Sequence, residues 1–106
     1  MPFVIGKNRA LILKDGPSAC KDVGDICFVF YDHMVKVWKR EPRWRTAHRI
    51  YRDFFDDEFY RYVCDQLYGK FSEVDVMNAD DLAWQVFFIK YVMPYEDLKE
   101  EENGTI

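Results

Sequence analysis

The basic and aromatic stretch between residues 36 and 52 is the part of the sequence best suited to chemistry. It holds seven Lys and Arg against Glu41 alone, a net charge of +6, and Trp38, Trp44 and Tyr51 are interleaved with the cations. Cations contact phosphates and exposed bases stack on aromatic rings, so this composition suits RNA or single-stranded DNA. Tryptophan, tyrosine and arginine are also common anchors of protein interfaces. The candidate contact residues are Lys36, Trp38, Arg40, Arg43, Trp44, Arg45, Arg49 and Arg52.

A simpler explanation is that the rings point inward while the cations face water or pair with acidic residues. Residues 53–106 hold fourteen Asp and Glu against four Lys and Arg, a net charge of −10, and the whole chain carries −4. That balance is far from the basic charge expected of a nucleic-acid-binding domain. We therefore expect a small protein-binding module that acts by occupying a partner, with nucleic-acid binding through residues 36–52 as the alternative.

The acidic residues could bind a divalent cation or act as acid and base if several converged in one cleft. Their spacing matches no metal-binding motif, and acidic side chains are favourable in the first turn of a helix. We therefore expect them to be helix-start or surface residues, with no metal site. The set is Asp53, Asp56, Asp57, Glu58, Glu73, Asp75, Asp80 and Asp81.

The cysteines and histidines do not form a recognisable site. Cys20, Cys27 and Cys64 form an odd set without close pairing, which argues against both a disulfide framework and a zinc motif. We expect Cys27 and Cys64 to be buried structural residues, and Cys20, in a loop, to be the one plausible reactive thiol. His33 and His48 are expected at the surface. The sequence thus predicts no enzyme, no metal and no cofactor.

Length and composition predict one intracellular domain. The chain has 106 residues, of which 49% are hydrophobic and 18% aromatic, enough to close a single core. The chain has no apolar run long enough to cross a membrane. The apolar segment at its N-terminus is shorter than the one that a secretory signal requires. We expect residues 1–95 to form the domain, residues 96–106 to be an acidic flexible tail, and the protein to be cytoplasmic. The type also suits an inhibitor, immunity or regulatory protein of a phage or mobile element, and a homodimer is compatible with it.

The strongest helical pattern lies in residues 42–69, bracketed by Pro42 and Gly69. Asp56, Asp57 and Glu58 resemble a helix start inside this stretch, so it is either one long helix or two with a slight kink. Its apolar residues recur at steps of three and four, the period of one buried helix face. They are Ala47, Ile50, Tyr51, Phe54, Phe55, Phe59, Tyr62, Val63 and Leu67.

The N-terminal third is predicted to be extended. Short apolar runs suggest an opening hairpin in residues 3–14 and an exposed loop in residues 15–25. A second hairpin is expected from residues 26–31 and 34–39 around Asp32-His33, because alternate residues of the first strand would share one face. Those residues are Ile26, Phe28 and Phe30.

The C-terminal part is predicted to be a helix that starts with Asn78 as its N-cap and ends at Pro94, after a brief extended piece at Val74 and Val76. This helix is apolar on nearly all sides, which is typical of a buried or interface helix. The sequence therefore predicts an α+β domain, in which a small antiparallel sheet packs against two or three C-terminal helices.

Overall fold

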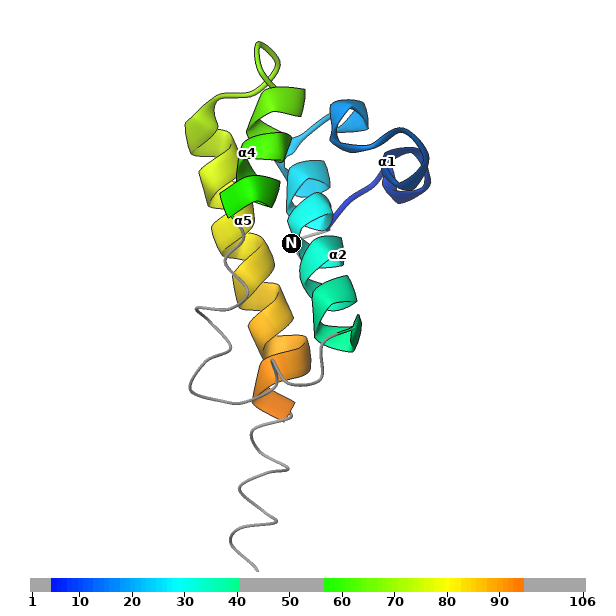
Figure 1. Cartoon of the computed structure of the whole chain (residues 1–106), viewed down its shortest axis with the longest axis vertical. Coiled ribbons are helices and arrows are strands. Elements are labelled where there is room, and N and C mark those ends of the chain that lie inside the picture. Colours follow the sequence, from blue (N-terminus) through cyan, green and yellow to red (C-terminus); the bar gives the residue numbers. More distant parts are fainter. Residues whose placement is uncertain (1–4, 41–56, 95–106) are drawn as a thin grey trace, which may run out of the picture.

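A computed structural model describes residues 5–40 and 57–94, and within these ranges all regular structure is helical (Figure 1). Since no strand occurs in the described ranges, the α+β prediction is wrong. The elements are α1 (Arg9–Asp15), the 3-10 turn η1 (Pro17–Ala19), α2 (Val23–Arg40), α4 (Asp57–Gln66), α5 (Glu73–Phe87) and the π-helical turn η4 (Phe88–Val92).

Helix α2 replaces both strands of the second predicted hairpin and the turn between them. Ile26, Phe30 and Met34 are buried and follow one another at steps of four, which is the spacing of one helix face. Two of them, Ile26 and Phe30, also belong to the alternating set that suggested a strand. β-branched and aromatic residues favour strands only weakly, and burial against neighbouring helices outweighs that preference. On α2, Asp32 pairs with Lys36 one turn later at 2.8 Å.

The N-terminal segment is also helical, which corrects the predicted opening hairpin. Within α1 only Ile12 is buried. The predicted exposed loop at residues 15–25 contains η1 and the buried Pro17, Cys20 and Asp25. At the start of α2, the Asp25 amide donates to the Asp22 carboxylate at 2.8 Å, which is the usual N-capping interaction of an aspartate.

Helices α2 and α5 lie side by side and run in the same direction, with α4 antiparallel to both (Figure 1). Trp38, near the end of α2, meets Phe87 edge to face at 5.7 Å between ring centroids, and Tyr91 of η4 at 6.4 Å. Large side chains that are less than 2% exposed fill the core. They include Ile26, Val63, Leu67, Val76 and Phe87.

Helix α5 begins six residues earlier than predicted, with its N-cap at Ser72 instead of Asn78. Ser72 is its N-cap, since the Ser72 hydroxyl accepts a hydrogen bond from the Asp75 amide at 3.2 Å. Asn78 is an exposed residue inside the helix, and Val74 and Val76 are helical rather than extended. The start at Ser72 has Asp75, rather than the Glu or Gln of a capping box, at its third helical position. It therefore gives a weaker signal than Asn78 followed by Asp80 and Asp81.

Helix α4 confirms part of the long helical pattern. Asp57 and Glu58 occupy its first turn, and Gly69 lies just beyond its end with a positive φ of 82°. Residues 42–56 and the acidic tail at residues 96–106 lie outside the described ranges.

Candidate functional site

The described structure contains three of the eight candidate contact residues. Lys36 and Arg40 are exposed on the last turns of α2, but Trp38 is only 6% exposed and packs on η4 and α5. The ring of Trp38 is therefore part of the core rather than of a contact surface. Outside the described residues lie Arg43, Trp44, Arg45, Arg49 and Arg52.

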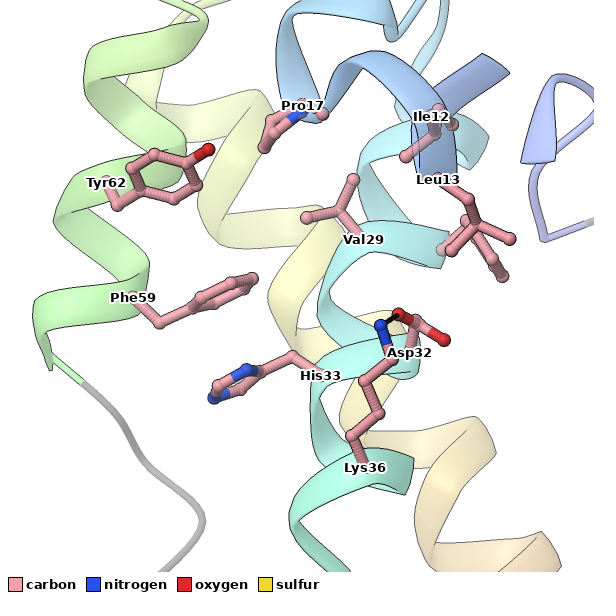
Figure 2. A pocket seen from close by; sticks show the side chains of 11 residues that line it. Ile12, Leu13, Pro17, Val29, Asp32, His33, Lys36, Phe59 and Tyr62 are labelled. Atoms are coloured by element: carbon pink, nitrogen blue, oxygen red, sulfur yellow. Dashed lines mark ion pairs between the residues drawn. The ribbon is translucent and has the colours of Figure 1, made fainter. Parts of the chain in front are cut away.

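A groove of about 170 Å³ opens between α1, α2 and α4 (Figure 2). Its walls are mostly apolar. Ile12 and Pro17 come from α1 and η1, Val29 from α2, and Phe59 from α4. The groove is thus made by three helices that meet only in the folded chain, and we call it the α1–α2–α4 groove.

An aromatic stack forms one wall of the α1–α2–α4 groove. The His33 ring lies flat on the Phe59 ring, with centroids 3.8 Å apart and an interplanar angle of 7°. Phe59 in turn meets the buried Phe30 edge to face at 5.8 Å, which fixes the stack against the core. His33 therefore lies on a helix against an aromatic ring, rather than in an exposed turn.

The rim of the groove carries exposed apolar side chains. Leu13 of α1 is 60% exposed and Tyr62 of α4 is 47% exposed, and both line the groove. Leucine and tyrosine side chains are usually more buried than this, so a partner that covers them would gain hydrophobic burial.

The polar edge of the groove is the Asp32–Lys36 ion pair, drawn in Figure 2. Lys36 is 65% exposed and Asp32 is 29% exposed, so the cation is the more accessible member. Lys39 and Arg40 follow on α2, and both are exposed. This end of α2 therefore offers positive charge beside an apolar groove.

The thiols are poorly placed for chemistry. Cys20 and Cys27 have no exposed surface, and burial, assisted by nearby carboxylates, raises the pKa of each to about 12. Both remain protonated at neutral pH and are weak nucleophiles. The structure thus buries Cys20, the one thiol for which a reactive role was considered, directly after η1. Burial also raises the pKa of Cys64, which shares a hydrogen bond with the Tyr60 hydroxyl.

The acidic residues do not form a metal site in the described part of the chain. There, no group of three or more His, Cys, Asp or Glu side chains is placed to hold a metal ion. Among the carboxyls of residues 5–40 and 57–94, Asp80 alone has a raised pKa, of about 6, because it is buried and lies near Asp81.

The groove residues other than Lys36 were not singled out from the sequence as contact residues. Phe59 and Tyr62 were recognised only as part of a buried stripe, and Leu13 was assigned to a strand. If residues 9–15 had been assigned to a helix, Leu13 would have been expected to point in a different direction from its neighbour Ile12. With Ile12 facing the core, Leu13 would then have been recognised as an exposed leucine.

Comparisons with protein families, curated proteins and solved structures found no match to this chain. Among the described helices, none is long and apolar enough to cross a membrane.

Proposed function

We propose that this chain is a small helical protein-binding module whose α1–α2–α4 groove takes one bulky apolar side chain from an acidic segment of a partner protein. The observation that carries the proposal is the apolar groove with Leu13 and Tyr62 exposed on its rim. The module acts by occupying the partner, as an inhibitor, immunity or regulatory protein does.

The size of the groove supports a side chain as its occupant. Sites for drug-sized molecules and cofactors usually enclose about 300–1,000 Å³. A cavity of about 150 Å³ is large enough for one benzene molecule. The groove, at about 170 Å³, therefore matches one aromatic ring or one branched aliphatic side chain.

Charge supports an acidic neighbour for that side chain. Lys36 is exposed at the groove edge, and Lys39 and Arg40 extend the positive surface along α2. Complementary charge at an interface speeds association and selects partners. A partner segment with a carboxylate near its apolar anchor would meet this surface.

We place the activity in the cytoplasm. The three cysteines are free, and two of them are fully buried, as is usual for a protein kept in a reducing compartment.

The test compares groove variants with a matched control. Tagged wild-type protein, Leu13→Asp, Tyr62→Asp and Val74→Asp would be used to capture partners from the native cell extract after nuclease treatment. Val74 is a suitable control because it is 59% exposed on a helix, like Leu13 at 60%, but lies away from the groove. Circular dichroism would establish that all four proteins are folded.

The expected result is one stoichiometric protein captured by the wild type and by Val74→Asp, and lost with both groove variants. Purified partner should also bind Lys36→Glu several-fold more weakly, with a smaller dependence on salt. Capture that is unchanged by both groove variants would overturn the proposal. Recovery of nucleic acid alone, lost at high salt, would favour the nucleic-acid alternative, and recovery of a second copy would identify a homodimer.

A further inference from the structure

We propose that Arg9 and Lys90, which lie over the Phe28 and Tyr31 rings one turn apart on α2, form a binding site for a phosphate group together with the Tyr31–Tyr91 pair. This phosphate site lies between the start of α1, the middle of α2 and η4. It adjoins the α1–α2–α4 groove at Phe28, which lines the groove and lies beneath Arg9, but the tyrosines and the two cations of this site do not line the groove. It is also independent of the proposed function.

The two tyrosines supply the hydrogen-bond donors. Their ring centroids are 6.4 Å apart, and their hydroxyls share a hydrogen bond. Burial raises the pKa of Tyr31, and the Tyr91 hydroxyl raises it further, although Arg9 acts in the opposite direction. Tyr31 is therefore protonated at neutral pH. When two hydroxyls share one hydrogen bond, one of them keeps its own hydrogen free to donate to a ligand.

Arg9 is held in place beside this pair by the N-terminal turn. Its Nε donates to the Ile5 carbonyl at 2.8 Å, and its Cζ lies 4.9 Å from the centroid of Phe28, one turn before Tyr31 on α2. Gly6 packs so closely on Phe28 that a Cβ atom there would lie 2.7 Å from the Phe28 Cβ. Within the described part of the chain, the two terminal nitrogens of the guanidinium, with four N–H groups, donate to no acceptor and are available to a ligand. A cation held in this way loses little conformational freedom on binding.

Lys90 is positioned by the π-helical turn. Its Nζ lies 5.7 Å from the centroid of the Tyr31 ring. Within the same turn, Tyr91 stacks on Phe87 at 5.4 Å with an interplanar angle of 20°, which anchors the turn to the core. Single π-helical turns in α-helices occur frequently at functional sites. Two unrelated local structures thus place a cation over each of two aromatic rings that are one turn apart on α2.

The charge of this site is not neutralised by the described residues. Within residues 5–40 and 57–94, neither Arg9 nor Lys90 forms an ion pair, whereas Lys36 is paired with Asp32. Two cations and a free hydroxyl hydrogen match a ligand with two negative charges and several acceptor oxygens. Phosphate has this chemistry at neutral pH, as does a phosphate monoester, whereas a carboxylate carries a single charge.

The test is an NMR titration of the full chain at pH 7.5, with inorganic phosphate added at constant ionic strength and sodium chloride as the reference salt. A second titration would use glycerol 3-phosphate as a simple phosphate monoester. The proteins would be the wild type, Lys90→Ala, Arg9→Ala, Tyr91→Phe and the matched control Lys14→Ala, an exposed lysine on α1. Lys90 is exposed, so its variant should fold even if Arg9→Ala disturbs the N-terminal turn.

We expect saturable shifts at Tyr31, Lys90 and Tyr91. Affinity should fall about tenfold in Lys90→Ala and about threefold in Tyr91→Phe, because a charged contact is worth more than a neutral hydrogen bond. It should change less than about twofold in Lys14→Ala. Tighter binding of glycerol 3-phosphate would support an organic phosphate as the ligand, and equal binding would support free phosphate. Shifts that do not saturate, or an equal loss in Lys14→Ala and Lys90→Ala, would overturn the proposal.

Discussion

Two aspartates in this protein are held in opposite ways. Asp25, with no exposed surface, accepts hydrogen bonds from the amides of Lys7, Asn8 and Lys21 at 3.0, 3.3 and 2.8 Å, and from the Asn8 side chain at 3.0 Å. Burial favours its neutral form, but these bonds together outweigh burial and lower its pKa. Asp80 receives no comparable bonds among the described residues, and burial and Asp81 raise its pKa to about 6.

The difference shows how two parts of the fold are stabilised. The Asp25 carboxylate joins the N-terminal turn to the start of α2. Four N–H groups donate hydrogen bonds to this carboxylate and replace the water that it loses on burial, so the charged form stays favourable. The contact between α2, α4 and α5 depends on apolar packing. There, Asp80 lies close enough to Cys27 and Tyr60 to raise the pKa of each, although burial is the larger cause at both. A negative charge is therefore favourable at Asp25, where N–H groups surround it, and unfavourable at Asp80, between the packed helices.

The largest effect is expected from removing the Asp25 carboxylate. Asp25→Ala leaves three backbone N–H groups without their acceptor, which should lower the free energy of unfolding by about 4 kcal/mol. Since the pKa of Asp25 is lowered, its contribution is present above the unfolded-state pKa of about 4 and is lost as the pH falls. Urea unfolding at pH 7 measures the loss, with the exposed Asp65→Ala as a control. A change below about 1 kcal/mol would contradict this role for Asp25.

The second prediction concerns the turn that Asp25 holds. Gly6→Ala should cost about 3 kcal/mol, because Gly6 has a positive φ of 76° and a new Cβ would contact Phe28 at 2.7 Å. Gly69→Ala is the matched control, with a φ of 82° and no atom within 4 Å, so only backbone strain of about 1 kcal/mol is expected. Thermal unfolding of both variants separates the two contributions. Equal losses would show that the contact with Phe28 has no energetic effect.

The third prediction is that the contribution of Asp80 to stability depends on pH in the opposite direction to that of Asp25. A carboxyl whose folded pKa is raised stabilises the protein below its unfolded pKa of about 4, and this contribution disappears as the pH rises through about 6. Asp80→Asn should therefore be more stable than the wild type at pH 8, by about 2 kcal/mol after allowance for partial solvent exposure. Urea unfolding of both proteins at pH 5 and pH 8 tests this. A difference that does not depend on pH would contradict the raised pKa.

The smallest effect is expected at the N-terminus of α5. Ser72→Ala removes the side-chain acceptor of the Asp75 amide and should cost about 1 kcal/mol, the usual value of an N-cap. Ser72→Asp should retain most of that stability, since aspartate is an equally good cap. The comparison with Asn78→Ala, an exposed position inside the helix, tests where the helix starts: a larger loss at Asn78 would support the later start predicted from the sequence.

Several features of the fold could be predicted from residues next to one another in the chain. The acidic first turn of α4, the glycine after its end and the helical period of residues 82–93 depend on local backbone chemistry, and all three were recognised. Residues 23–40 could not be assigned in the same way. Their apolar residues satisfy both a period of two and a period of 3.6, and only packing against α5 selects the helix.

The candidate sites were even less accessible to sequence analysis, because each combines side chains from separate elements. His33 and Phe59 are far apart in the chain, as are Tyr31 and Tyr91, and no spacing rule connects them. Trp38 was predicted to be a surface contact residue because basic residues surround it in the sequence. In the structure its ring packs against the rings of Phe87 and Tyr91. A residue's neighbours in sequence do not determine which face of its helix meets the core.

By itself, the sequence determined that this chain would fold around large aromatic side chains, that residues 36–52 would be strongly basic, and that a helix would end just before Gly69. Composition and charge follow directly from the sequence, and the end of a helix depends on only a few adjacent residues. Both can therefore be predicted without a structure. Only the tertiary structure decided that α2 is a helix, that the pKa of Asp25 is lowered while that of Asp80 is raised, and that Arg9 and Lys90 lie over neighbouring aromatic rings of α2. Burial and electrostatic environment are set by residues distant in the chain, so they exist only once the helices have packed.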